Sequence, residues 1–193
     1  MYNLKKGLNI PISGSPEGTV SDSTKISHVG ILGPDYVGMK PTMMVEVGDE
    51  VKIGSVLFED KKNPGVFFTS PAGGLIKSIN RGEKRRFISI EIEVADQENQ
   101  VEILNDDNDI LLRNLSKYGF INNFRTRPFN KTPKPNDIPD DIFVNICDTN
   151  PLSVDPYIYL QHEIDLFNRS LIKLKEIFNC NIHVCYQNND FNN

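Results

Sequence analysis

The chain has 193 residues and a net charge of −5 at neutral pH, so its length allows one large domain or two small ones. The negative charge and the lack of a long Lys/Arg run exclude a general nucleic-acid binder. No segment has the ~20 consecutive apolar residues that a membrane span needs, so we expect no direct membrane span. The three cysteines, Cys147, Cys180 and Cys185, form no paired framework or metal-ligand spacing and are predicted to be structural thiols in a reducing compartment.

Short apolar runs alternate with Gly, Pro and Asp turns over residues 1–98, which predicts an all-β domain. Its last run, Phe87–Val94, alternates strictly. We expect the isoleucines at even positions to face one side and Ser/Glu the other, as in a half-exposed antiparallel strand. The densest basic run, Lys84-Arg85-Arg86, is predicted to be a solvated hairpin tip.

The stretch Gly48–Lys61, followed by Thr69–Ile76, predicts two strands that meet at a hairpin and a Pro/Gly turn into a third strand. This is the pattern of a barrel-sandwich hybrid, the architecture of lipoyl and biotinyl carriers. Such carriers are modified on the Lys of an Asp-Lys pair, and Asp60-Lys61 matches that pair. The approach from Leu57 is shorter than in carriers and the following turn differs, so we expect an unmodified structural hairpin.

Residues 99–193 have a different periodicity, after a polar stretch at Ala95–Asp107 that is typical of a linker or a meander edge. A short helix with Ile110, Leu111, Leu112 and Leu115 on one side is predicted to end at Gly119. The apolar run Ile142–Cys147 then predicts a strand buried on both faces.

Asp155-Pro156 is expected to open one long helix, whose apolar stripe extends from Tyr157 to Phe178, and a second strand follows at Asn181–Tyr186. Strand, helix and strand form a βαβ unit, so residues 99–193 are predicted to be an incomplete Rossmann-like α/β domain. Two strands and one helix cannot bury both sheet faces. We therefore expect a truncated chain or a fragment of a longer protein.

Six blocks resemble, in order and spacing, the amino-terminal part of the A subunit of the Na+-translocating NADH:ubiquinone (quinone) reductase family. They span essentially the whole chain: Lys5–Gly14, Gly33–Pro41, Leu57–Val66, Ile79–Arg85, Arg125–Phe129 and Phe143–Leu152. Members of that family are more than twice as long.

The resemblance implies a peripheral subunit, without a cofactor of its own, that docks through the complex on the cytoplasmic side of the inner membrane. It further implies an enzyme complex that couples NADH oxidation and ubiquinone reduction to Na+ export. In that assembly the flavins, the iron–sulfur centre and the NADH site belong to partner subunits. This subunit would contribute structure and access for ubiquinone.

The second domain also resembles the flavin-binding domain of the flavoprotein subunit of respiratory complex I. No Gly-x-Gly-x-x-Gly or Walker motif occurs in the sequence, and arginines and phenylalanines stand in Tyr118–Phe129 where that family has its glycine-rich loop. Bulky side chains would meet the phosphate where it needs bare amides. The resemblance thus implies a nucleotide-binding fold that has lost its nucleotide.

Candidate contact residues follow the first parallel strand, because ligands of open α/β sheets bind at the carboxyl ends of strands. Asp148, Thr149 and Asn150 lie there, and Arg125, Arg127 and Phe129 are expected to border the same crevice. They are predicted to contact a quinone head group or a partner subunit. The alternative is local turn and cap chemistry with a surface ion pair. No catalytic or metal-binding residue is assigned.

Two other functions stay open. A subunit of a related Fe–S electron-transport complex would need Cys-x-x-Cys-x-x-Cys runs, which this sequence lacks. A lipoyl or biotinyl carrier domain would need Lys61 to be modified.

Overall fold

The computed structural model describes residues 11–21, 24–96, 99–101, 114–148 and 150–186. The chain divides into two compact units. Lys25–Ile138 form the first, which we call the β unit, and Met1–Thr24 with Pro139–Asn193 form the second, the α/β unit. The predicted domain boundary at residue 98 stays a prediction.

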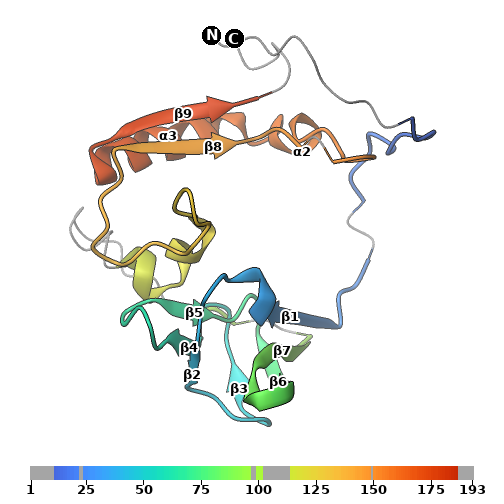
Figure 1. Ribbon diagram of the computed structural model, residues 1–193. Coiled ribbons are helices and arrows are strands. Elements are labelled where there is room, and N and C mark those ends of the chain that lie inside the picture. The colour runs from blue at the N-terminus through green and yellow to red at the C-terminus, as the bar shows by residue number, and fades with distance from the viewer. Residues whose placement is uncertain (1–10, 22–23, 97–98, 102–113, 149, 187–193) are drawn as a thin grey trace. The chain divides into compact units, whose positions relative to one another are not determined.

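Two antiparallel sheets build the β unit, as the alternating apolar pattern predicts (Figure 1). The four-stranded sheet has the order β1-β7-β6-β3, and the three-stranded sheet has the order β2-β4-β5. Their bounds are β1 His28–Leu32, β2 Pro41–Met43, β3 Glu50–Val51, β4 Val56–Asp60, β5 Phe67–Thr69, β6 Gly74–Arg81 and β7 Phe87–Val94. Three 3-10 turns join them or follow them: η1 Gly33–Asp35, η2 Glu83–Arg85 and η3 Phe120–Asn123.

Strand β7 follows the predicted alternation except at its start. Ile90 and Ile92 are fully buried, but Ile88 is 43% exposed, while Phe87 is buried. The register between β6 and β7 shifts at Asn80/Arg81, next to the hairpin end. The prediction for Ile88 was therefore wrong, because this shift gives the inward position to the larger aromatic ring.

An aromatic stack fills the space between the two sheets. The Phe58 ring lies parallel to Phe68 at a centroid distance of 4.6 Å and edge-on to Phe87 at 5.2 Å. Tyr36 packs edge-on against Phe68, also at 4.6 Å. Burying each large apolar side chain contributes about 1.5–3 kcal/mol. The rest of the core consists of aliphatic side chains: Val51, Leu57, Val66, Ile76, Ile90, Ile92 and Ile121.

The turn after β4 is organised by a buried carboxylate. Asp60 is 3% exposed and accepts hydrogen bonds from the backbone N–H groups of Lys40 and Lys62, both at 3.0 Å. It also accepts one from Asn63 Nδ2 at 2.9 Å. A buried carboxylate needs such donors, because leaving it without partners is costly. Asp60 thus ties the β4–β5 turn to the segment that enters β2.

The helix predicted before Gly119 is described at residues 114–117, whereas Ile110, Leu111 and Leu112 lie outside the described residues. Gly119 has a φ of 77°, the left-handed conformation expected of a helix end. Within the polar stretch, Gln100 forms an isolated β-bridge with Ile53, and Val101 N donates to Ile53 O at 2.9 Å. This part of the stretch lies against the β unit through a parallel bridge, and the choice between a linker and a meander edge stays a prediction.

In the α/β unit, strands β8 (Asp141–Asn145) and β9 (Asn181–Cys185) pair in parallel, and helix α3 (Ile164–Phe178) connects them. The single long helix predicted from Asp155 is wrong, since α2 (Tyr157–Leu160) ends before α3 begins. Asp155 still caps the first helix, because its Oδ1 accepts from Tyr157 N at 3.0 Å. Glu163 has φ −124° and ψ 18°, which lie outside the helical region. It therefore separates the two helices and is the N-cap of α3.

Strand β8 is buried on one face rather than on both. Ile142 is 8% exposed, whereas Phe143, on the opposite face, is 67% exposed and stacks on His183 at 4.7 Å. Helix α3 lies along one side of the β8–β9 pair (Figure 1). The prediction of two buried faces was wrong, since one helix covers one face of a sheet. Cys185, which was predicted to be a structural thiol, is exposed at the end of β9.

Replacing Asp60 with Ala should lower the free energy of unfolding by about 2–3 kcal/mol, because Lys40 N, Lys62 N and Asn63 Nδ2 lose their acceptor. The matched control is Asp49→Ala. It removes the same charge from an exposed turn where Oδ2 accepts one bond, from Glu46 N at 2.8 Å, and should cost less than about 1 kcal/mol. Urea denaturation measures both. Equal losses would contradict the organising role of Asp60.

Candidate functional site

A cavity of about 440 Å³ lies in the β unit beside η3, and we call it the Asn122 cavity. Its wall includes the second half of β1, the end of β5 and the turn that carries Tyr36. Ile53–Gly54, Ser70–Pro71 and Gln100–Val101 also line it, together with Tyr118–Phe120, Asn122 and Asn123. These last residues begin the segment Tyr118–Phe129, for which the loss of a glycine-rich loop stays a prediction.

Asn122 gives this cavity a polar group. Its side chain is 8% exposed, and Nδ2 donates to Phe67 O at 2.7 Å. Among the residues that the structure describes, Oδ1 has no hydrogen-bond partner. A buried acceptor of this kind calls for an N–H or O–H donor. The Oδ1 atom has less than 1 Å² of exposed surface, so it is buried in the wall and is not presented to a ligand in the cavity.

Close packing at Gly119 brings this segment onto β5. A Cβ at Gly119 would lie 2.6 Å from Thr69 Oγ1, and the φ of 77° also disfavours other residues. Thr69 Oγ1 donates to Tyr118 O at 3.2 Å. Gly119 is thus explained by its close contact with the sheet. Its presence is therefore no sign of a phosphate-binding loop.

Arg125 is tied to the edge of this cavity. Its guanidinium lies 5.1 Å from the centroid of the Tyr36 ring, and Nη1 donates to the backbone carbonyls of Asn122 and Phe124. Burial raises the pKa of Tyr36 above its ordinary value, and the positive charge of Arg125 partly offsets that shift. Tyr36 consequently stays protonated and can donate a hydrogen bond. The side chain of Arg125 is already bound to its own loop.

Arg127 and Phe129 are less constrained. Arg127 Nη1 donates to Asn130 Oδ1 at 3.3 Å, and Phe129 is 72% exposed. The Arg127–Pro128 peptide bond is cis. An exposed arginine beside an exposed aromatic ring offers a cation and an apolar face to a partner or ligand.

Asp148 and Asn150 form a turn in the α/β unit. Asp148 Oδ1 accepts from Asn150 N at 2.9 Å and from Asn150 Nδ2 at 2.7 Å, and Ser153 Oγ donates to Asp148 O at 2.8 Å. Thr149 lies outside the described residues. These contacts are the local turn chemistry that Asp and Asn favour. A shared crevice with Arg125, Arg127 and Phe129 stays a prediction.

Lys61 lies in the turn after β4, as predicted, and its side chain is exposed. Its backbone N–H donates to Lys40 O at 2.8 Å. Exposure alone does not separate a carrier lysine from a structural turn, so its unmodified state stays a prediction. In the described part of the chain, no three His, Cys, Asp or Glu side chains gather as a metal site.

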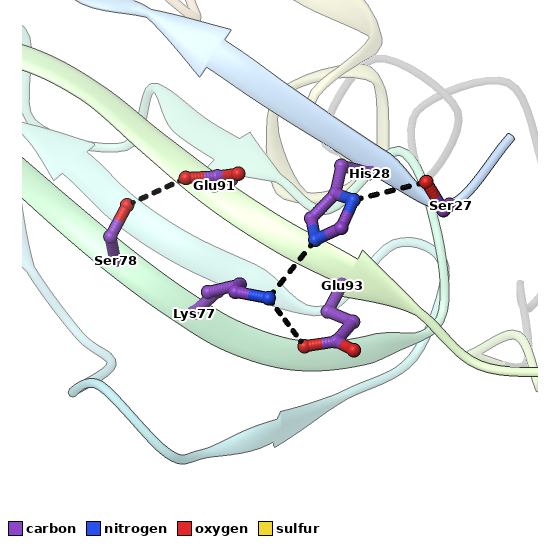
Figure 2. Close-up of polar contacts among 6 residues, drawn as sticks. All are labelled: Ser27, His28, Lys77, Ser78, Glu91 and Glu93. Atoms are coloured by element: carbon purple, nitrogen blue, oxygen red, sulfur yellow. Dashed lines mark hydrogen bonds and ion pairs between the residues drawn. The ribbon is translucent and has the colours of Figure 1, made fainter.

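The structure shows a row of polar contacts on the four-stranded sheet that the sequence does not predict (Figure 2). Lys77 Nζ donates to Glu93 Oε2 at 3.0 Å and to His28 Nε2 at 3.2 Å, which joins β6, β7 and β1. Ser78 Oγ donates to Glu91 Oε2 at 3.0 Å beside it. Lys77 occupies a bulge, since the register shifts between Ile76 and Ser78. Sequence periodicity carries no signal for that bulge.

The Lys77–Glu93 pair should show in the titration of Glu93. The hydrogen bond and charge of Lys77 lower the pKa of Glu93 from its ordinary 4.5. A lowered carboxyl pKa means stabilisation that is complete above pH 4.5 and is lost as pH falls through the folded-state value. Lys77→Met should raise the Glu93 pKa, as measured by NMR titration. Lys25→Met, which removes the partner of Asp96, is the control and should leave Glu93 unchanged.

Two family models match the chain in sequence. The NqrA N-terminal barrel-sandwich hybrid domain matches residues 2–95, and the NqrA second alpha/beta domain matches residues 106–193. These descriptions agree with the two sheets of the β unit and the βαβ unit that follows. The barrel-sandwich hybrid and the α/β fold predicted from the sequence are both confirmed.

Curated relatives are named as the A subunit of a Na(+)-translocating NADH-quinone reductase. The protein of Yersinia pseudotuberculosis serotype O:1b (strain IP 31758) is 45% identical over 193 residues, which cover 96% of this chain and 43% of that protein. Those of Neisseria meningitidis serogroup B and Histophilus somni are 46% and 43% identical over 192 residues, with the same coverage. The chain thus spans about two fifths of the length of these relatives. It belongs to the NqrA family and carries that family's amino-terminal barrel-sandwich hybrid domain and second α/β domain.

Proposed function

We propose that the chain acts as the amino-terminal part of the A subunit in a Na+-translocating NADH:quinone reductase. It is a peripheral subunit that contributes structure, on the cytoplasmic side of the inner membrane, to a complex that couples NADH oxidation and quinone reduction to Na+ export. The observation that carries this proposal is the agreement in sequence over 96% of the chain, across both domains and in the same order.

NADH, flavins and iron–sulfur centres belong, in this proposal, to partner subunits. The helices that the structure describes are all too short or too polar to cross a bilayer. Attachment to the membrane complex then runs through contacts with its other subunits.

The geometry of the loop after Gly119 supports a subunit without a flavin. A phosphate loop needs free backbone N–H groups. Here Asn122 N donates to Gly119 O, Phe124 N to Ile121 O and Thr126 N to Lys131 O. Because these amides already have acceptors inside the loop, they are not available to a pyrophosphate.

Arg127 and Phe129 supply the quinone or partner contact in this proposal. Exposed Arg and aromatic side chains are the residue types that dominate the binding energy of protein interfaces. A quinone head group would use the same pair, since its carbonyls accept hydrogen bonds and its ring stacks on an aromatic face. Asp148, Thr149 and Asn150 contribute a second set of polar groups.

Arg127→Ala tests the contact in the reconstituted complex. We expect the melting temperature to change little, because the side chain makes one long hydrogen bond at the surface. NADH-driven quinone reduction or assembly of the complex should fall. A raised KM for quinone with intact assembly would indicate a quinone contact, and loss of co-purification a contact with a partner subunit.

The comparison variant is Arg125→Gln. The guanidinium of Arg125 donates to two backbone carbonyls and lies over the Tyr36 ring. The substitution should lower stability by about 1–3 kcal/mol, with activity falling in proportion. If Arg127→Ala affected neither assembly nor activity, the contact role would be refuted.

The purified chain should also bind no FMN. Absorbance at the flavin bands should disappear on gel filtration after incubation with FMN, because the loop amides are occupied. A stoichiometric flavin signal that survives the column would contradict a subunit without a flavin.

A further inference from the structure

A second hollow of the β unit lies on the hairpin between β6 and β7, where the sequence predicts only a solvated tip. One wall is the segment from Gly33 to Pro41, and the other is Arg81 with Lys84–Phe87. The volume is about 440 Å³. Five basic side chains line this hollow, which we call the basic pocket: Lys40, Arg81, Lys84, Arg85 and Arg86.

The two walls are held in place by close packing and by the hairpin's own hydrogen bonds. A Cβ at Gly33 would lie 2.6 Å from Phe87 O, so only glycine lets η1 approach the start of β7 this closely. In the hairpin, Gly82 N donates to Arg86 O at 2.8 Å and Arg85 N to Gly82 O at 3.1 Å. Phe87 is buried and belongs to the core. The pocket is therefore anchored to the core of the β unit.

The charges in this pocket are not neutralised by the chain. In the described part of the chain, none of the five cations forms an ion pair, although the protein as a whole has a net charge of −5. Three acidic residues nearby do not line the pocket. Asp35, within the first wall segment, lines the Asn122 cavity instead. Glu83 belongs to the same hairpin, and Asp60 is occupied by its three donors. Like charges held together repel one another, and an anion between them would relieve this repulsion.

The shape and chemistry of the pocket select among anions. Its volume falls in the range of ~300–1,000 Å³ that is typical of small-ligand sites, so it suits a discrete anionic group better than a flat acidic protein surface. Arginine forks bind phosphate oxygens in pairs, and lysine adds point charges. Val37, which is 50% exposed, and Met39 give one wall an apolar surface beside these cations.

We propose that the basic pocket binds a phosphate group carried by a small molecule or by a lipid head group, with Arg81, Arg85 and Arg86 as its principal ligands. This binding does not depend on the proposed function. It requires neither quinone nor the partner subunits, and it uses none of the residues assigned to that contact.

Titration of the full chain with inorganic pyrophosphate, followed by calorimetry and by NMR of the arginine Nε–H groups, tests the site. Arg85→Gln/Arg86→Gln should weaken binding about tenfold or more, since two of the five cations are lost. The matched control is Arg169→Gln/Lys175→Gln on α3, which removes the same charge and should leave binding unchanged. Both pairs are exposed, so thermal melting should show that the variants fold.

A second arm separates the two sources of phosphate. Sedimentation with vesicles of phosphatidylcholine, with and without one fifth phosphatidylglycerol, measures binding to a lipid head group. If pyrophosphate binding is saturable and is lost in the hairpin variant, the ligand is a soluble molecule. If the chain binds the anionic vesicles but not pyrophosphate, the ligand is a lipid head group. Binding to neither probe overturns the proposal, as does equal weakening by the hairpin and control variants. Polyglutamate binding as tight as that of pyrophosphate would also overturn it, because the pocket would then respond to charge alone.

Discussion

The β unit depends on the aromatic stack of Phe58, Phe68 and Phe87, which joins its two sheets. Phe58 and Phe68 come from adjacent strands of the three-stranded sheet, and Phe87 begins β7 of the other sheet. Close ring contacts fix the positions of the strands that carry them. Both hollows of the β unit are built on this stack, since Phe68 lines the Asn122 cavity and Phe87 lines the basic pocket.

Tyr36 links the two hollows to each other. Its ring packs on Phe68 and carries Arg125 above it, and the residue lines both pockets. Tyr36 is therefore the one lining residue of the segment Gly33–Pro41 that both hollows share. The fixed positions of Arg125 and Tyr36 leave Arg127 as the arginine of the loop that is available to a partner.

Sequence patterns predicted the sheets and the βαβ order, because alternation and turn residues are local signals. The family was predicted from six blocks that resemble it. They failed where tertiary packing decides. Ile88 lost its inward position to Phe87 through a register shift, and Phe143 is exposed because one helix covers one face. The Lys77 bulge, the buried acceptor on Asn122 and the basic pocket depend on contacts between distant segments, so no local pattern indicates them.

The β unit is thus held together by its own aromatic core, whereas the described part of the α/β unit buries little. There, among the described residues, Ile142 and Cys180 are the buried hydrophobic side chains. Hydrogen exchange of the full chain measures this difference directly. We expect the slowest exchange in the strands between Val51 and Ile92 and rapid exchange in β9. Equal protection of β9 and of the strands around the aromatic stack would show that the aromatic core is not what sets the stability of the fold.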